Sequence, residues 1–265
     1  MGFALSQTPL LTLEEGVLSA PISSAGPGNP LSSDAINEVA AAVRALGAGE
    51  LPEVRVLLLY GPGKNFCAGG DVAGFAAADD RSAHVYDVAD RFHELVRAIE
   101  MLDVPVVAQA SGWAAGAGLS LLLGADVVVG GPDTTVLAAY AGLGFTPDGG
   151  MSWYLPRVLG ARAAATAMLL NEPITGRRAY EAGIITDFVE DGDVAGRTEK
   201  VCATLARGPR ESQARIKRLL RDSRTNDLGT QLDAERESIS QMASHPEGVE
   251  GVNAFVEKRR PEFPA

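Results

Sequence analysis

Continuous apolar runs alternate with helix-like segments along the first part of the chain. Residues 54–60, 104–110 and 125–129 form such runs, each with a single polar residue, Arg55, Gln109 and Asp126 respectively. Runs of this length without polar alternation predict strands that are buried on both faces. Apolar strands that alternate with helices are typical of a largely parallel sheet covered by helices, so the pattern predicts an α/β fold.

The two ends of the chain differ from this middle. Residues 10–18 hold two short apolar runs around a Glu-Gly turn, which predicts a hairpin. Ser33 or Asp34 is expected to cap a helix in which apolar residues recur at helical spacing. Only helical spacing remains in the C-terminal part, so residues 1–195 are expected to form a core and residues 196–265 a helical region.

Composition and charge restrict the partners of the chain. It has 34 acidic and 23 basic residues, a formal net charge of −11 and a pI of about 4.8. Because binding to nucleic acid phosphates needs a surplus of Lys and Arg, this balance argues against a general nucleic-acid binder. An anionic ligand would need a local basic patch.

No segment suggests export or membrane insertion. Residues 1–13 lack the positive start and continuous apolar stretch of a signal peptide, and no window reaches the length of a membrane span. We therefore expect a cytoplasmic protein. Cys67 and Cys202 are too few for a disulfide framework and show no metal-ligand spacing, so we expect two reduced thiols and no metal site.

Two predicted strands run directly into glycine-rich turns, at 61–71 and 111–118. Glycine lets a backbone N–H approach a ligand closely, and the second turn also opens a helix whose dipole favours a negative oxygen. Two such N–H groups can form an oxyanion hole. The alternative is a dinucleotide-binding turn, which needs a third glycine at position 121, where this chain has Leu121.

The same segments resemble the crotonase (enoyl-CoA hydratase/isomerase) superfamily. The matching segments are 66–71 (Phe-Cys-Ala-Gly-Gly-Asp), 105–112, 115–118, Asp126, 142–150, 155–157, 181–185, 247–248 and 254–259. Their order and spacing agree over essentially the whole chain.

This resemblance implies the crotonase (ClpP/crotonase-like) fold, with repeated ββα units forming two roughly perpendicular sheets and residues 196–265 as a trimerisation region. In the family, two N–H groups hold the oxygen of an acyl-CoA thioester, and the matching positions here are Gly70 and Ala117. The implied partner is an acyl-CoA substrate, with coenzyme A as part of the substrate and no separate cofactor. The implied assembly is a homotrimer or a dimer of trimers.

The side chains around the acyl group select the reaction. Hydratases similar to this chain use two glutamates, and the aligned positions hold Ser120 and Tyr140. A serine hydroxyl is a poor base and a tyrosine titrates at about pH 10, so neither can replace a carboxylate. Hydration by the usual two-glutamate mechanism is therefore not expected.

Asp148 is the carboxylate that remains. It resembles an aspartate that dienoyl-CoA isomerases and the ring isomerase of phenylacetate degradation use for proton transfer. One carboxylate in an apolar acyl pocket is enough to move a proton from one carbon to another. Without the resemblance, Pro147-Asp148-Gly149-Gly150 would be interpreted as a turn in which the aspartate makes local hydrogen bonds.

Two aromatic residues and a histidine are further candidates for the acyl pocket. The 4-chlorobenzoyl-CoA dehalogenases, which use the matching aspartate as a nucleophile, carry a histidine where His93 falls. The alternative for His93 is a partly exposed helix residue. Trp153 and Tyr140 can line an acyl pocket, although core packing is the commoner role of such residues.

The remaining candidates concern the coenzyme A part of the substrate. Ala68 lies in the turn that precedes Gly70. Lys64 resembles a lysine that meets the CoA phosphates, and Lys258 resembles one that a neighbouring subunit supplies. The alternative for both lysines is a solvated surface position.

We expect an enoyl-CoA double-bond isomerase with Asp148 as the proton shuttle. One alternative is another CoA-thioester reaction at the same site, such as ring isomerisation, hydrolysis, dehalogenation or atypical hydration. The other is a member that binds acyl-CoA without turnover.

Overall fold

The computed structural model describes residues 5, 8–26 and 28–264. Part of the segment 1–13, which was examined for a signal peptide, lies outside the described residues. Within the described ranges, no helix is both long and apolar enough to cross a lipid bilayer.

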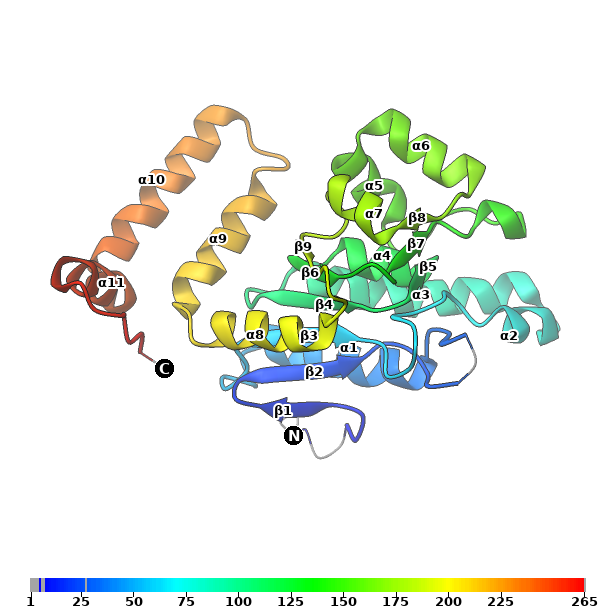
Figure 1. Ribbon diagram of the computed structural model, residues 1–265, viewed down its shortest axis with the longest axis horizontal. Coiled ribbons are helices and arrows are strands. Elements are labelled where there is room, and N and C mark those ends of the chain that lie inside the picture. The colour runs from blue at the N-terminus through cyan, green and yellow to red at the C-terminus, as the bar shows by residue number, and fades with distance from the viewer. Residues whose placement is uncertain (1–4, 6–7, 27, 265) are drawn as a thin grey trace.

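The larger sheet has six strands in the order β1, β2, β3, β4, β6, β9 among the described residues (Figure 1). Their bounds are β1 (Thr12–Glu14), β2 (Val17–Pro21), β3 (Val56–Tyr60), β4 (Val106–Ala110), β6 (Val127–Gly130) and β9 (Asp187–Phe188). Strands β1 and β2 form the predicted antiparallel hairpin, and every other neighbouring pair is parallel. The predicted parallel sheet is confirmed.

A smaller sheet and the helices complete the fold. The smaller sheet contains β5 (Trp113–Ala115), β7 (Thr135–Leu137) and β8 (Ile174–Thr175). The helices are α1 (Ser33–Gly47), α2 (Val72–Ala77), α3 (Arg81–Glu100), α4 (Ala117–Leu123), η2 (Ala141–Leu143), α5 (Met151–Leu159), α6 (Ala161–Leu170), α7 (Gly176–Glu181), α8 (Val194–Ala206), α9 (Arg210–Asp222), α10 (Leu228–Ser244) and α11 (Pro246–Glu257).

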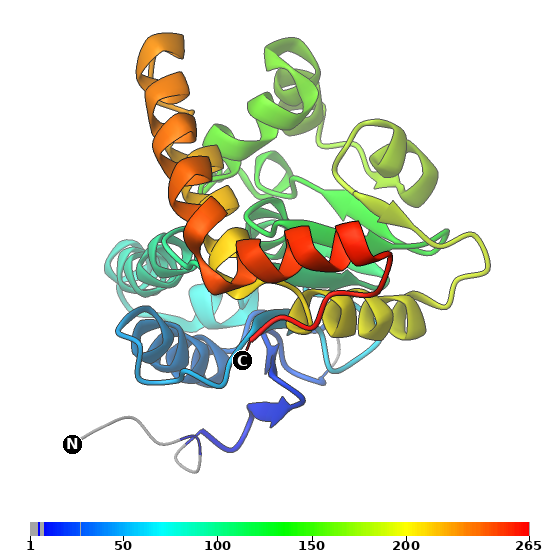
Figure 2. The ribbon, with the colours of Figure 1, turned by 90° about the vertical axis from the view of Figure 1, so that its left-hand side faces the viewer.

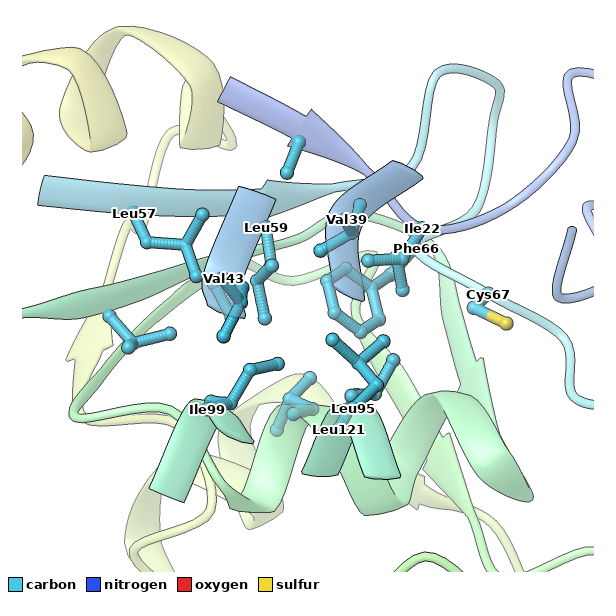
Figure 3. Close-up of a cluster of buried hydrophobic side chains, with 14 of the residues drawn as sticks. Ile22, Val39, Val43, Leu57, Leu59, Phe66, Cys67, Leu95, Ile99 and Leu121 are labelled. Atoms are coloured by element: carbon cyan, nitrogen blue, oxygen red, sulfur yellow. The ribbon is translucent and has the colours of Figure 1, made fainter. Parts of the chain in front are cut away.

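The core lies on both faces of the larger sheet, which explains the continuous apolar runs. Leu57 and Leu59 of β3 face a cluster formed with α1 and α3, where Val43 and Ile99 also lie (Figure 3). Val56 belongs to a second cluster that includes residues of α8. Because successive strand side chains point to opposite faces and helices cover both faces, every position of the strand is apolar.

Helix α1 begins one residue away from the predicted cap. The cap is Ser32, whose side-chain oxygen accepts the N–H of Ala35 at 3.2 Å. The predicted caps, Ser33 and Asp34, are instead the first two residues of the helix. Several polar residues at a helix start compete for this role, and the backbone conformation decides among them.

The C-terminal helices α9, α10 and α11 extend to one side of the core (Figures 1 and 2). Helix α8 packs on the sheet, so the part that stands apart begins with α9. Helix α9 is tied to the core by an ion pair between Lys217 and Asp126 and by another between Arg218 and Asp103. The carboxylate of Glu247 in α11 accepts two N–H groups in the first turn of α9, those of Glu211 and Ser212, which joins these two helices.

Candidate active site

The two glycine-rich turns are held side by side. The N–H of Cys67 donates to the carbonyl of Trp113 at 3.1 Å, and the N–H of Ala115 donates to the carbonyl of Cys67 at 2.9 Å. A Cβ at Gly118 would lie 2.4 Å from the Cys67 carbonyl oxygen, so only glycine permits this approach. The pairing brings Gly70 and Ala117 to the wall of one cavity.

Two backbone N–H groups at this wall have no acceptor among the described residues. Ala117 is the first residue of α4, and the first N–H groups of a helix have no intrahelical partner. Gly70 lies in the turn before α2, and its N–H donates to no described group. Such a pair can stabilise negative charge on an oxygen that enters the cavity.

The cavity has a volume of about 680 Å³ and a mostly apolar wall. This volume is within the range of ligand pockets, about 300–1,000 Å³. Part of the wall was missed by sequence reasoning: Phe75 of α2, Val85, Val88, Ala89 and Phe92 of α3, and Phe145 after η2. The α3 residues recur at helical spacing, so one face of this helix could have been identified from the sequence.

Asp148 also lines this cavity, from the turn before α5. The next residue, Gly149, has a φ of 60°, and a Cβ there would lie 2.3 Å from the Phe92 ring and 2.8 Å from the Ser120 side chain. Glycine at position 149 therefore lets the turn before α5 pack closely against both α3 and α4. This close packing sets the position of the neighbouring Asp148.

Ser120 and Tyr140 both contact Asp148. The hydroxyl of Tyr140 donates to Asp148 Oδ1 at 2.5 Å. Ser120 is fully buried, and its hydroxyl donates to the backbone carbonyl of Asp148 at 2.9 Å. Burial and the adjacent Asp148 carboxylate raise the pKa of Tyr140 well above its usual range, so the phenol stays protonated.

His93 lies behind Asp148 and is not part of the cavity wall. Its Nε2 accepts the N–H of Gly149 at 3.0 Å and lies 3.9 Å from Asp148 Oδ2. A nitrogen that accepts a hydrogen bond has no proton to give, so Nε2 does not donate to Asp148 in this arrangement. His93 is 36% exposed at its side chain, as expected for a partly exposed helix residue.

The other predicted site residues are divided between different surfaces. Ala68 lines the cavity. Lys64 is exposed and lines a neighbouring cavity of about 630 Å³. Lys258 is exposed at the end of α11, in the C-terminal helices.

Trp153 lies outside the acyl cavity. It projects from α5 into a separate cavity, between the guanidinium groups of Arg157 at 3.8 Å and Arg224 at 4.8 Å from its ring. The acyl-pocket role expected for Trp153 does not agree with this position, because its ring packs against cationic side chains of α5 and the segment after α9. Within the described ranges, no group of three or more His, Cys, Asp or Glu residues could hold a metal ion.

Comparison with known proteins shows the family of this chain. A family described as enoyl-CoA hydratase/isomerase matches residues 12–265. The 1,2-epoxyphenylacetyl-CoA isomerase of Escherichia coli (strain K12) is 37% identical over 216 residues, 79% of this chain and 81% of its own. The 4-chlorobenzoyl coenzyme A dehalogenase-1 of Arthrobacter sp is 27% identical over 77% of this chain and 75% of its own.

A solved structure is similar over nearly its full length. The crystal structure of an enoyl-CoA hydratase from Polaromonas sp. JS666 has a TM-score of 0.89 at 30% identity, covering 96% of this chain and 98% of its own. The chain belongs to the enoyl-CoA hydratase/isomerase family, whose members act on acyl-CoA thioesters, and it has the crotonase fold.

Proposed function

We propose that this protein moves a carbon–carbon double bond in an enoyl-CoA thioester, with Asp148 as the base and acid. One observation carries the proposal: Asp148 lines the same cavity as Gly70 and Ala117, whose N–H groups have no acceptor among the described residues. The carboxylate and the two donors can therefore act on one bound acyl group.

The reaction needs no further reactant. With a 3-enoyl thioester bound, Asp148 removes a proton from the α-carbon, and the electron pair moves to the thioester oxygen. The N–H groups of Gly70 and Ala117 stabilise that negative charge, and loss of one such donor typically costs a factor on the order of a hundred or more in rate. Asp148 then returns the proton to the γ-carbon, which gives the 2-enoyl thioester.

The neighbouring side chains support isomerisation over hydration. Hydratases similar to this chain use two glutamates, and Ser120 and Tyr140 stand at those positions. Ser120 is fully buried and donates to the Asp148 backbone, and Tyr140 donates to the Asp148 side chain. Neither residue is available to activate a water molecule as a base.

The test is exchange of α- and γ-protons with deuterated water across a panel of enoyl-CoA esters. We expect wild-type protein to exchange and isomerise a 3-enoyl ester, and Asp148→Asn to lose about 10²–10⁴-fold in rate. Asp34→Asn, an exposed aspartate at the start of α1, is the control and should keep full activity. Undiminished exchange in Asp148→Asn would exclude Asp148 as the base. Tight binding of CoA esters without any exchange by wild type would favour a binding protein.

A second candidate is dehalogenation of 4-chlorobenzoyl-CoA. In it, Asp148 attacks the ring carbon that carries chlorine, the carbon–chlorine bond breaks and chloride leaves. Water then hydrolyses the aryl ester and restores the Asp148 carboxylate. The 3.9 Å between His93 Nε2 and Asp148 Oδ2, together with the similarity to a 4-chlorobenzoyl coenzyme A dehalogenase, favours testing it. Against it, the lone pair of Nε2 that would take a proton from water accepts the Gly149 N–H. The intact mass of the protein mixed with 4-chlorobenzoyl-CoA decides this, because the nucleophilic mechanism leaves an aryl group on the protein.

We also propose that the chain assembles as a homotrimer or a dimer of trimers through its C-terminal helices. Large apolar residues on these helices are exposed in the single chain, among them Leu228, Ile239, Val252 and Phe255, the last with 86% of its surface exposed. Such a surface is usually covered by a partner. Light scattering after gel filtration tests the assembly, and a monomer at micromolar concentration contradicts it.

A further inference from the structure

The two carboxylate oxygens of Asp148 have different surroundings. Oδ1 accepts the phenol O–H of Tyr140 at 2.5 Å. The nearest charged or titratable partner of Oδ2 is His93, at 3.9 Å. Because the His93 nitrogen that faces Oδ2 already accepts the Gly149 N–H, it offers Oδ2 no proton. Oδ2 therefore has no hydrogen-bond donor among the described residues.

Tyr140 is held so that its hydroxyl donates to this carboxylate. The hydroxyl of Ser120 gives its proton to the Asp148 carbonyl and lies 3.4 Å from the Tyr140 oxygen. The backbone just before Tyr140 is anchored by the N–H of Ala139, which donates to Asn171 Oδ1 at 2.7 Å. Burial, together with the Asp148 charge, raises the pKa of Tyr140, which keeps the donor proton in place.

We propose that Tyr140 is a positioning residue that holds Oδ1 of Asp148, so that Oδ2 alone takes the proton from the substrate and returns it. This inference rests on the isomerisation proposed above. In the first step the α-carbon–hydrogen bond breaks, an Oδ2–H bond forms, and the electron pair moves to the thioester oxygen. In the second step the Oδ2–H bond breaks as the γ-carbon–hydrogen bond forms.

A carboxylate that cannot turn keeps the proton it has taken on the side of the substrate. We therefore expect a substrate labelled with deuterium at the α-carbon to deliver part of that label to the γ-carbon in ordinary water. Without the phenol, the carboxyl group can rotate and exchange its proton with water. The transferred fraction should then fall.

Loss of the phenol should also change the pH dependence. A hydrogen bond to a carboxylate favours the charged form, which is the active base. The groups facing this carboxylate are Tyr140 at the start of η2 and His93 on α3, and Arg81 is the charged residue on the same cavity wall. Removing the bond should move the acidic limb of the kcat profile to higher pH.

The experiment compares Tyr140→Phe with Tyr154→Phe. Tyr154 is a matched control because its hydroxyl also donates to a carboxylate, Glu100 Oε2 at 2.6 Å, outside the acyl cavity. In Tyr140→Phe we expect kcat for a 3-enoyl-CoA ester to fall at least about tenfold, because the released carboxylate spends less time with Oδ2 directed at the substrate. KM should stay within about twofold, the acidic limb should shift, and the transferred fraction should drop. Tyr154→Phe should leave all four quantities near their wild-type values.

Further variants keep the outcomes distinct. Tyr140→Trp, which restores an N–H donor, should recover part of kcat and of the transferred fraction. If Tyr140→Phe is unfolded at the assay temperature, Tyr140→Trp tests the positioning role in its place. In an Asp148→Asn background, Tyr140→Phe should cause no further loss. If wild-type protein exchanges protons and the Tyr140→Phe variant behaves like wild type, this inference is wrong, whereas the proposed function still stands. No exchange by wild type with any enoyl-CoA ester overturns the proposed function, and this inference with it.

Discussion

The hydroxyl of Ser120 donates a 2.9 Å hydrogen bond to the backbone carbonyl of Asp148. Ser120 is the position where the resemblance led us to expect a glutamate in a hydratase, and Asp148 supplies a carboxylate to the cavity wall. Ser120 is fully buried on α4, where it supports the Asp148 turn.

This contact predicts what substitution at position 120 will do. Ser120→Ala should lower the free energy of unfolding by about 1 kcal/mol through the lost hydrogen bond. Ser120→Glu should cost on the order of 3 kcal/mol or more, because a carboxylate would be buried without a partner, and it should not create hydratase activity. Urea unfolding measures the change in stability, and a hydration assay measures the activity.

Ser244→Ala is the control. It removes a similar bond to a backbone carbonyl at an exposed site and should change stability by less than about 0.5 kcal/mol. A stable, hydrating Ser120→Glu protein would contradict this prediction.

Gly149 gives a second prediction. Gly149→Ala should destabilise the protein by about 2–4 kcal/mol and abolish most activity, because its Cβ would clash with Phe92 and displace Asp148. Gly49→Ala separates the clash from backbone strain: Gly49 also has a positive φ, 75°, but nothing lies within 4 Å of its added Cβ. It should cost only about 1 kcal/mol. Equal losses of thermal stability in the two variants would show that strain, and not packing, requires Gly149.

The buried thiols lead to a prediction about pH. Burial raises the pKa of Cys67 from 9.0 to about 11, and burial does the same for Cys202. In the unfolded chain these thiols ionise near their ordinary value, whereas in the folded protein they stay neutral. Their contribution to stability is therefore complete below pH 9 and is lost as the pH rises towards 11.

Thiol labelling and urea unfolding check this. At pH 8, iodoacetamide should modify neither cysteine in the folded protein and both in guanidinium chloride. The free energy of unfolding should fall between pH 9 and pH 11, and it should fall less in Cys67→Ala than in wild type. Rapid labelling of native Cys67 at pH 8 would be inconsistent with the buried, neutral thiol.

The contact between α9 and α11 yields a stability prediction for the C-terminal region. Glu247 is buried and accepts the N–H groups of Glu211 and Ser212 at 2.9 and 3.0 Å. Glu247→Ala leaves both donors without a partner and should cost about 2–3 kcal/mol. Glu235→Ala, at an exposed position of α10, should cost less than about 0.5 kcal/mol. If hydrogen exchange of the α9 amides is unchanged in Glu247→Ala, the cap does not stabilise this helix.

The sequence predicted the α/β class because a strand buried on both faces needs mostly apolar residues, and β3, β4 and β6 show this pattern, with Gln109 of β4 as the polar exception. It also indicated two glycine-rich turns after strands. Helix caps were less certain, as Ser32 shows, because adjacent polar residues satisfy the same requirement.

The partners of each side chain were decided only by the tertiary structure. Trp153 and Tyr140 are both aromatic residues near Asp148 in the sequence, yet one packs between two arginines outside the acyl cavity and the other donates to the carboxylate. The amino-acid sequence determined which face of each helix or strand is buried, because local periodicity carries that information. Which residues meet across η2, α3, α4 and the turn before α5 depends on how separate elements pack, because those contacts join residues far apart in the chain.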